Sequence, residues 1–292
     1  MDISIIIVSY NTKDLIGDCI RSALAAKDCE LEFFVIDNAS KDGSAAFVRT
    51  TFPTVHLIPN NANRGFAAAN NQALPLVQGR YILFLNPDTT VPADSLAAMV
   101  SFMDVHPQIG LAGTKILNPD GTEQWSVSSR YPGQKFTRRE LDGLPGPIAC
   151  VLGAAMIART DLIRKLTGFD ESFFLYGEDQ DLCLRIRRSG YEIGFIENAP
   201  VMHIGGQSER ESTDADIWER KVAAEFLFYE KHYEDNTIRR IMRAEHLKAL
   251  WRIVGLKAML PFTIDKSKAR AKLTKYSVIL KFINERRSVR FC

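Results

Sequence analysis

The chain has 292 residues, of which 46% are hydrophobic and 25% charged, a composition that excludes wholesale disorder and allows a large core. The net charge of +2 argues against a chain that binds nucleic acid over its whole length. The charge is uneven, because residues 236–292 hold 15 Lys and Arg against 3 Asp and Glu. We therefore predict an acidic globular domain at 1–235 and a basic tail at 236–292.

The cysteines and apolar runs indicate a cytoplasmic chain. The five cysteines are scattered without a CxxC pair, which argues against a disulfide framework or a zinc site and favours a reducing compartment. The first apolar run, 3–8, follows an aspartate and lacks a basic segment before it, so we expect no signal peptide. The longest uncharged run, 143–158, is shorter than 18 residues and contains two prolines, so we expect no membrane span.

Apolar runs alternate with segments of helical periodicity in the first half of the chain. Four runs predict strands, at 3–8, 32–36, 55–58 and 81–85. Three periodic segments predict helices, at 15–24, 65–77 and 93–106. This alternation implies crossover connections and a mainly parallel sheet flanked by helices, an α/β fold.

The second half is less regular. Residues 111–150 are rich in Gly, Pro and polar residues, and we expect long loops or a small antiparallel excursion there. A further strand is predicted at 153–158 and a helix at 180–189. Two basic amphipathic helices are predicted at 237–260 and 266–287. Such helices are typical of a membrane surface, which we prefer, and they also occur as a helical cap on the main domain with a solvated basic face.

Polar clusters follow three of the predicted strands: 9–11, 37–40 and 86–88. One such cluster alone is usually a helix cap or a turn. Three together predict a ligand site, because ligands bind beyond the carboxyl ends of parallel strands. Neither GxGxxG nor GxxxxGK[ST] occurs, so dinucleotide and P-loop chemistry are unsupported.

Two aspartates in these clusters have both a functional and a structural interpretation. Asp37 can accept a hydrogen bond from a nucleobase N–H, or it can open an Asx-turn. Asp88, beside a proline, can present its carboxylate to a hard divalent cation that holds phosphates, or it can cap a helix.

Carboxylates are concentrated at Glu178, Asp179 and Asp181, at the start of a predicted helix. One acid would complement the helix dipole, whereas three add like-charge repulsion and indicate a function. An ionised carboxylate at a helix N-terminus suits a general base. His203 precedes two glycines that would let the backbone approach a phosphate, although a lone histidine is more often structural.

Taken in order, these residues resemble the family 2 inverting glycosyltransferases, which have the GT-A fold, a Rossmann-like α/β architecture. The segments that carry the resemblance are SIIIVSYN (4–11), VIDNASKDGS (35–44), NRGFAAANN (63–71), LFLNPDTTV (83–91), GFDESFFLYGEDQDLCLRIRRSGY (168–191) and HIGGQS (203–208). The resemblance covers about residues 1–230 and is greatest to the bacterial rhamnosyltransferase-like branch, with NPDGTEQ (118–124) as further support. The tail is not covered.

The resemblance implies a role for each matching residue. Asp37 would bind the nucleobase, and the residues around the nucleotide would be Ser9, Tyr10, Asn11, Asn38 and Arg64. Asn86 replaces the first aspartate of the family's DxD motif, and its amide can still hydrogen-bond a ribose hydroxyl.

The remaining implied roles concern the metal and the reaction. Asp88 and His203 would bind Mg²⁺ or Mn²⁺. Asp179 would be the catalytic base, which Glu178 and Asp181 would support, or these two would orient the acceptor. An acceptor wall could be formed by Trp125, Arg130, Tyr131 and Tyr176, although aromatic residues are more often core.

The implied activity is an inverting transfer of a sugar, preferably rhamnose from dTDP-rhamnose, to a hydroxyl of a glycan or lipid-linked saccharide of the cell envelope. The tail would hold the enzyme peripherally at the inner face of the plasma membrane, on anionic lipid. Two alternatives stay open: a UDP-hexose or UDP-galactofuranose donor, and a catalytically silent scaffold that binds sugar nucleotides. A nucleotidyltransferase is disfavoured, because its Gly- and Arg-rich phosphate loop is missing.

Overall fold

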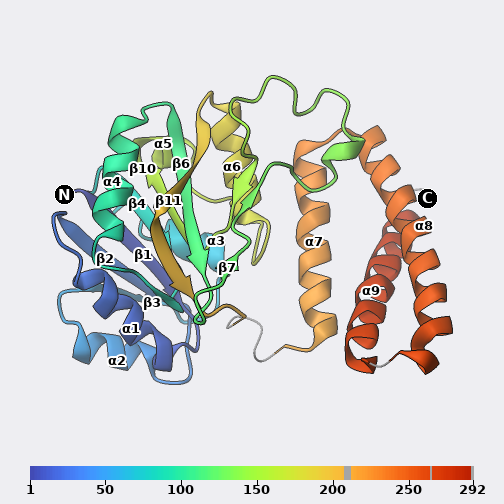
Figure 1. Cartoon of the computed structure of the whole chain (residues 1–292), viewed down its shortest axis with the longest axis horizontal. Coiled ribbons are helices and arrows are strands. Elements are labelled where there is room, and N and C mark those ends of the chain that lie inside the picture. Colours follow the sequence, from blue (N-terminus) through green and yellow to red (C-terminus); the bar gives the residue numbers. More distant parts are fainter. Residues whose placement is uncertain (207–211, 264, 291–292) are drawn as a thin grey trace. The chain divides into compact units, whose positions relative to one another are not determined.

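The computed structural model describes residues 1–206, 212–263 and 265–290, with side chains as far as residue 286. The chain divides into two compact units (Figure 1). The first unit consists of residues 1–131, 144–174 and 178–208. The second consists of residues 132–143, 175–177 and 209–292. The boundary predicted at residue 235 falls within the second unit.

The first unit is built on one mixed sheet. Its strands are β1 (Ile3–Ser9), β2 (Leu31–Asp37), β3 (His56–Pro59), β4 (Tyr81–Leu85), β5 (Thr89–Thr90), β6 (Ile109–Leu117), β7 (Glu123–Gln124), β10 (Ala155–Arg159) and β11 (Glu192–His203). They lie in the order β3-β2-β1-β4-β10-β6-β11-β5, with β7 beside β6. Strands β1 to β4 are parallel, β10 is antiparallel to both neighbours, and β6 and β11 are parallel to each other. A separate pair is formed by β8 (Val127–Ser128) and β9 (Cys150–Val151).

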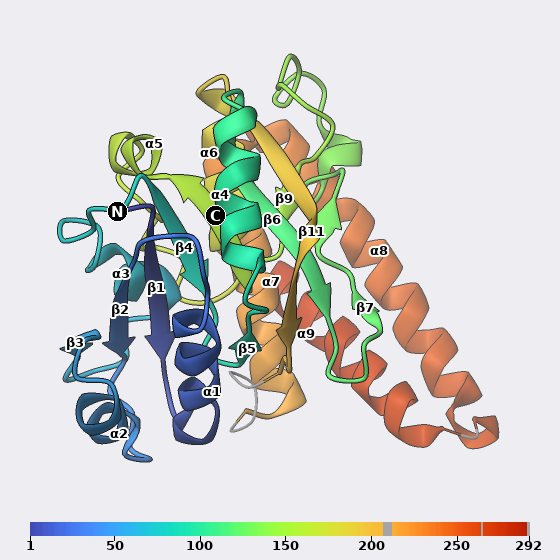
Figure 2. The same ribbon diagram turned by 60° about the vertical axis from the view of Figure 1, so that its left-hand side comes forward.

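Helices cover both faces of this sheet (Figure 2). They are α1 (Lys13–Leu24), α2 (Ser44–Thr51), α3 (Phe66–Asn71), α4 (Ser95–Val105), α5 (Thr160–Lys165) and α6 (Glu178–Arg188). Helices α1 and α4 lie on one face, and α3, α5 and α6 on the other. Alternate residues of the fully buried strand β1 explain this arrangement: Ile3, Ile5 and Ile7 enter the core beneath α1 and α4.

The α/β prediction is confirmed, and the elements that the sequence missed have a physical reason. The four strands of the first half form where they were predicted, whereas the helix expected at 65–77 ends at Asn71. Strand β6 extends into residues 111–150, where long loops or a small antiparallel excursion were expected, and two of its glycines are positions of close packing rather than turns. A Cβ on Gly113 would lie 2.5 Å from Val151, and one on Gly110 would lie 2.6 Å from Leu162.

The second unit is helical. Its elements are η1 (Gln134–Phe136), α7 (Asp214–His232), α8 (Asp235–Met259), η3 (Leu260–Phe262) and α9 (Lys266–Arg290). A capping box between Thr213 and Asp216 begins α7, and Phe226 of α7 packs on Phe282 of α9 with ring centroids 5.0 Å apart. Both helices predicted in the tail are present as α8 and α9. Within the described ranges, no helix is long and apolar enough to cross a bilayer.

Candidate active site

The three predicted polar clusters meet at one edge of the sheet. Strand β1 lies between β2 and β4 and is parallel to both. Its register places Ser9 opposite Asp37, and Ile7 opposite Leu85. The segments that follow these three strands therefore leave the sheet side by side, at the edge where parallel sheets bind ligands.

The loops after β1 and β2 are tied to each other. Asn11 has φ +52°, its backbone N–H donates to Ser40 Oγ at 3.0 Å, and its Oδ1 accepts from the Lys41 N–H at 2.8 Å. Ser9 is fully buried, with Oγ 2.9 Å from Thr12 Oγ1. Ser9 and Asn11 thus shape the loops, and Tyr10, which is 38% exposed, lies at the surface between them.

Asp37 has one carboxylate oxygen left for a ligand. The residue is 3% exposed, and its Oδ2 accepts from the Ser40 N–H at 3.1 Å. Its Oδ1 is buried without a hydrogen-bond partner among the described residues. A buried acceptor without a donor is costly, so a ligand N–H at this point would be favourable. The geometry fits the predicted nucleobase contact.

Asn38 holds the loop that carries Arg64. Its Nδ2 donates to Asn63 Oδ1 at 2.8 Å, and its Oδ1 accepts from the Arg64 N–H at 3.0 Å and from Asn60 Nδ2 at 3.1 Å. The Asn38 amide is therefore engaged by the loop, while the Arg64 side chain is exposed. Nucleotide contacts by these two residues stay a prediction.

The same loop lies against the segment that leads into α6. Gly65 has φ +83°, and a Cβ there would lie 2.5 Å from the Phe174 carbonyl oxygen. The Phe66 N–H donates to that oxygen at 2.8 Å. Only glycine allows this approach, which joins the loop after β3 to the residues just before the acidic cluster.

A tight turn after β4 carries Asn86 and Asp88. The Asn86 N–H donates to the Ala154 carbonyl at 2.9 Å, and Thr89 Oγ1 donates to the Asn86 carbonyl at 2.7 Å. The turn leads into β5, where Thr89 is paired with His203 at the end of β11. The short strand β5 thereby brings Asp88 next to a histidine that is far away in the sequence.

Asp88 and His203 form a buried pair. His203 Nε2 lies 3.4 Å from Asp88 Oδ1, and the Gly205 N–H donates to Asp88 Oδ2 at 3.0 Å. The Asp88 side chain is 5% exposed and that of His203 is 11% exposed. The two predicted metal ligands therefore lie together.

Gln124 orients the imidazole of His203. Gln124 Nε2 donates to Asn118 Oδ1 at 2.8 Å and to the His203 carbonyl at 2.7 Å, so its Oε1 is directed at His203 Nδ1, 3.0 Å away. With a proton on Nδ1, the lone pair of Nε2 faces the Asp88 carboxylate. Two facing lone pairs suit a cation between them. The sequence did not indicate this role for Gln124, although NPDGTEQ contains it.

These two residues fit a divalent cation that takes its other ligands from a donor molecule and water. Carboxylate oxygen and imidazole nitrogen are both ligands of Mn²⁺, and the carboxylate also suits Mg²⁺. In the described part of the chain, no group of three or more His, Cys, Asp or Glu side chains is placed to hold a metal ion. The pair would therefore need the diphosphate of a bound donor to complete the ligand set of the metal.

The three acids at the start of α6 have three different environments. Asp181 is 1% exposed and pairs with Arg185, whose Nε lies 2.7 Å from its Oδ2. Asp179 accepts from the Gln180 N–H at 2.8 Å and from the Gly153 N–H. Glu178 is 7% exposed, and its Oε2 has no partner among the described residues. The cluster is thus not a row of equivalent dipole-complementing charges.

Asp179 lies at the same sheet edge as Asp88. Gly153 packs against it, because a Cβ added to Gly153 would lie 3.6 Å from the Asp179 Cβ. The next residue, Ala154, accepts the Asn86 N–H, and Ala155 pairs with Leu85 at the end of β4. Since β10 is antiparallel, its first residue lies where β4 ends. The structure therefore brings the predicted base and the predicted metal ligands to one edge.

The family model described as glycosyl transferase family 2 matches residues 4–167, more than half of the chain. The chain belongs to glycosyltransferase family 2. It is therefore a glycosyltransferase, as the sequence predicted.

Two relatives illustrate the range of the family. An N-acetylglucosaminyl-diphospho-decaprenol L-rhamnosyltransferase of Mycobacterium tuberculosis is 24% identical over 230 residues, covering 68% of this chain and 75% of the relative. The Escherichia coli UDP-Glc:alpha-D-GlcNAc-diphosphoundecaprenol beta-1,3-glucosyltransferase WfaP is 33% identical over 185 residues, covering 62% of this chain and 68% of the relative.

Solved structures agree on the fold. The mannosyltransferase PcManGT of Pyrobaculum calidifontis, in complex with GDP-Man and Mn²⁺, aligns with a TM-score of 0.60 at 19% identity and covers 99% of this chain and 87% of that one. Residues 1–349 of Staphylococcus aureus TarS, in complex with UDP-GlcNAc, align with a TM-score of 0.52 at 19% identity and cover 77% of this chain and 65% of that one. The predicted GT-A fold is confirmed.

In this family 2 enzyme, burial raises the pKa of two neighbouring acids, Glu178 and Asp179. Burial raises the pKa of Glu178 to about 8, with the charge of Asp179 as the second cause. Burial also raises the pKa of Asp179, while backbone N–H groups of Gln180 and Gly153 oppose the rise. At neutral pH Glu178 is therefore protonated, and burial favours the protonated form of Asp179 as well, against the two backbone N–H groups that favour its ionised form.

Replacing Glu178 by Gln should flatten the pH dependence of stability. Because the folded-state pKa of Glu178, about 8, lies above the ordinary value of 4.5, the wild type loses stability as pH rises from about 4.5 to 8. The glutamine of the variant Glu178→Gln would stay neutral throughout. We expect the melting temperature of the variant to exceed that of the wild type by several degrees at about pH 8.5, and the excess to disappear near pH 4. Calorimetry across this range would show a pH-independent difference if Glu178 were not buried as an acid.

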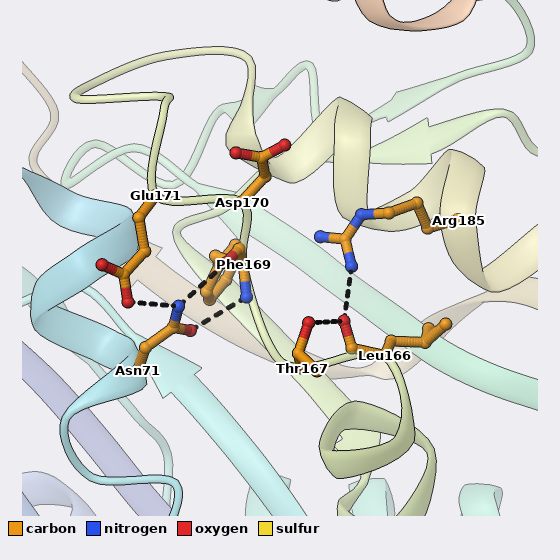
Figure 3. Close-up of a pocket in the computed structure, with 7 residues that line it drawn as sticks. All are labelled: Asn71, Leu166, Thr167, Phe169, Asp170, Glu171 and Arg185. Carbon is orange, nitrogen blue, oxygen red and sulfur yellow. Dashed lines mark hydrogen bonds between the residues drawn. The ribbon is translucent and has the colours of Figure 1, made fainter.

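The pocket drawn in Figure 3 is distinct from the predicted site. It is lined by Asn71, Leu166, Thr167, Phe169, Asp170, Glu171 and Arg185, none of them a predicted site residue. Each guanidinium nitrogen of Arg185 donates there, to the Leu166 and Gly168 carbonyls at 3.0 and 2.9 Å and to Asp181. The pocket therefore lies beside the Arg185–Asp181 ion pair, which ties helix α6 to the 166–168 segment.

The predicted acceptor wall is only partly supported. Trp125 is 72% exposed in the first unit and is free to face an acceptor. Tyr131 is 3% exposed, with the Arg187 guanidinium 5.7 Å from its ring, so its place in the wall was wrong and it is a core residue. Tyr176 belongs to the second unit, where the Lys221 ammonium lies 4.9 Å from its ring centroid. An acceptor role for Trp125 and Tyr176 stays a prediction.

Proposed function

We propose that the chain transfers a sugar from a nucleoside diphosphate donor to a hydroxyl of a lipid-linked saccharide, with inversion at the anomeric carbon. The observation that carries the proposal is the arrangement at one sheet edge: Asp88 lies 3.4 Å from His203, and Asp179 is held by the Gly153 N–H beside the end of β4. Family 2 membership supports the reaction class.

Each residue then has a defined part. Asp37 Oδ1 accepts the N3–H of the pyrimidine base, and Asn86 hydrogen-bonds the ribose. Asp88 and His203 would hold a divalent cation, which would supply the positive charge that stabilises a leaving diphosphate. Asp179 takes the proton from the acceptor hydroxyl as that oxygen attacks the anomeric carbon. Neutral Glu178 avoids a second negative charge next to the attacking oxygen, and Asp181 fixes the helix that carries the base.

The preferred donor is dTDP-rhamnose, and UDP-sugars are the alternative. The Mycobacterium tuberculosis relative is named as a rhamnosyltransferase, which supports rhamnose. The Escherichia coli relative is named for UDP-Glc and has the higher identity, which favours a UDP-sugar. Thymine and uracil present the same N3–H edge to Asp37, so this contact accepts either base.

The proposed acceptor is a polyprenyl-linked saccharide used for a cell-envelope polysaccharide. Both relatives are named for substrates joined through a diphosphate to a polyprenol. Such an acceptor requires the enzyme at a membrane, and we place it peripherally at the inner face of the plasma membrane, through the basic segment 236–292.

A donor panel tests this function. The purified full chain would be incubated with Mn²⁺, a short-chain GlcNAc-diphospho-polyprenol and one of dTDP-rhamnose, UDP-glucose, UDP-galactofuranose or GDP-mannose. We expect nucleoside diphosphate release and a disaccharide product with dTDP-rhamnose or one UDP-sugar, and GDP-mannose serves as the purine comparison. Transfer from GDP-mannose alone would contradict the proposed pyrimidine donor, and no transfer from any donor would contradict the function.

A further inference from the structure

Helix α8 has two apolar faces, and only one of them is used by the fold. The inner face carries Ile238, Ile241, Met242 and Ala249, which are 0 to 6% exposed and pack within the second unit. A surface helix of a globular protein ordinarily has one such face, with polar residues opposite it. The composition of the other side of α8 therefore needs a separate explanation.

The outer face is apolar and exposed. Leu247, Leu250, Trp251 and Val254 are spaced i, i+3, i+4, i+7 and are 67%, 41%, 68% and 68% exposed. This spacing places them on one side of the helix, opposite Ala249. Further along, Met259 and Phe262 are 66% and 86% exposed at the end of α8 and in η3. We call these six residues the α8 stripe.

Cations border the α8 stripe. Exposed Lys248 and Arg252 lie on one side of it and exposed Lys257 on the other, as their helical positions show. The Arg252 guanidinium lies 4.8 Å from the Trp251 ring centroid. Past the stripe, exposed Lys266 and Lys268 begin α9.

The acids of this region do little to offset these cations. Glu245 lies 3.0 Å from Lys248, and Asp265 lies 3.4 Å from Lys268. Both acids are therefore already matched by a nearby lysine, whereas Arg252, Lys257 and Lys266 add to the positive charge around the stripe.

We propose that the α8 stripe inserts into the interface of an anionic lipid bilayer, with α8 lying along the membrane surface. A row of four large apolar side chains that includes a Trp, followed by exposed Met259 and Phe262 at the end of the helix and flanked by Lys and Arg, is what such an interface accepts. A second copy of this chain fits less well. If two stripes packed face to face, the cations that border them would repel each other, whereas anionic headgroups would complement those cations. This inference rests on the proposed function only in that a lipid-linked acceptor requires a membrane.

Vesicle binding tests the stripe on the full chain. We expect the wild type to cosediment with vesicles of phosphatidylcholine and phosphatidylglycerol, and to bind pure phosphatidylcholine at least about tenfold more weakly. The double variant Trp251→Ser, Phe262→Ser should bind the anionic vesicles at least about tenfold more weakly than the wild type. The matched control is Val105→Ser, an equally exposed apolar residue in the first unit, which should bind as the wild type does.

Insertion depth supplies a second measurement that does not depend on removing the stripe. Lipids brominated near the headgroup should quench the fluorescence of the wild type, and Trp251→Phe should lose most of that quenching while still binding the vesicles. Quenching that persists in Trp251→Phe would place another tryptophan in the membrane and overturn the assignment. So would a double variant that binds as the wild type does, or a concentration-dependent dimer without lipid that the double variant abolishes.

Donor binding by the same variants separates the two proposals. Titration with nucleoside diphosphate and Mn²⁺ should give equal affinity for the wild type and the double variant. A wild type that binds the nucleotide normally but binds no vesicles would overturn the α8 stripe and leave the proposed function standing. A wild type that binds vesicles but no nucleotide would do the reverse.

Discussion

Asp179→Asn should lower kcat at least about 10²-fold while leaving the dissociation constant of the donor within about twofold of the wild type. The amide keeps the volume of the side chain, and its oxygen can still accept the Gln180 N–H bond. It cannot take a proton from the acceptor hydroxyl, so only the chemical step should suffer. Melting temperature should not fall, since the replacement removes a buried acid whose pKa is raised by burial.

Single-turnover transfer and donor titration measure the two effects separately. Asp161→Asn is the matched control, because Asp161 is an exposed acid in the first turn of α5 in the same unit. It should transfer sugar at the wild-type rate. Near-normal turnover in Asp179→Asn would remove Asp179 from the role of base.

Asp88→Ala should abolish the effect of the metal on donor binding. In the wild type, removing Mn²⁺ with EDTA should weaken the binding of the nucleotide sugar at least about tenfold if, as proposed, Asp88 and His203 hold the cation that the diphosphate binds. In the variant, affinity should be low both with and without EDTA. His203→Ala should act in the same direction, since it removes the second ligand, 3.4 Å from the first.

Calorimetric titration with and without EDTA gives these four affinities directly. Asp94→Ala is the matched control: Asp94 is exposed, a few residues further along the same segment, and makes no side-chain capping bond to α4. It should keep the full response to EDTA. An equal wild-type titration in the presence and absence of EDTA would count against a metal site at Asp88 and His203.

The sheet of the first half could be predicted because its strands are continuous apolar runs. Residues 3–8 and 81–85 read as buried strands, and β1 and β4 are buried throughout. Strands β6 and β11 could not be found in this way. Glycines let β6 pack closely against Val151 and Leu162, and β11 contains polar and charged residues and register shifts against β6, so neither has a clean period.

The pairing of Asp88 with His203 depends on these missed elements. It is made by the two-residue strand β5 on β11, and no periodicity in the sequence indicates a strand so short. The residue types made His203 a weak candidate by itself, and the family resemblance, not a local pattern, pointed to it. Gln124, which orients the imidazole, was missed because a glutamine in a polar loop gives no sign of its partner.

Residue types also failed to separate the members of each cluster. Three acids at 178–181 looked alike in sequence, but depth and a single arginine give them different environments. Among the polar residues after β1 and β2, Ser9 and Asn38 are held by protein groups, while Asp37 has one buried oxygen free of any partner among the described residues. These residues differ in burial and in hydrogen-bond partners, and both depend on the three-dimensional structure rather than on residue type.

A crystal structure of the full chain with Mn²⁺ and the nucleoside diphosphate of the preferred donor would test the central claim most directly. We predict an anomalous manganese peak bonded to Asp88 and His203 Nε2, the diphosphate on its open side, the base on Asp37 Oδ1, and the Asp179 carboxylate facing the space where the sugar would be attached. A nucleotide bound elsewhere, or an Asp179 carboxylate turned away from the diphosphate, would contradict the account.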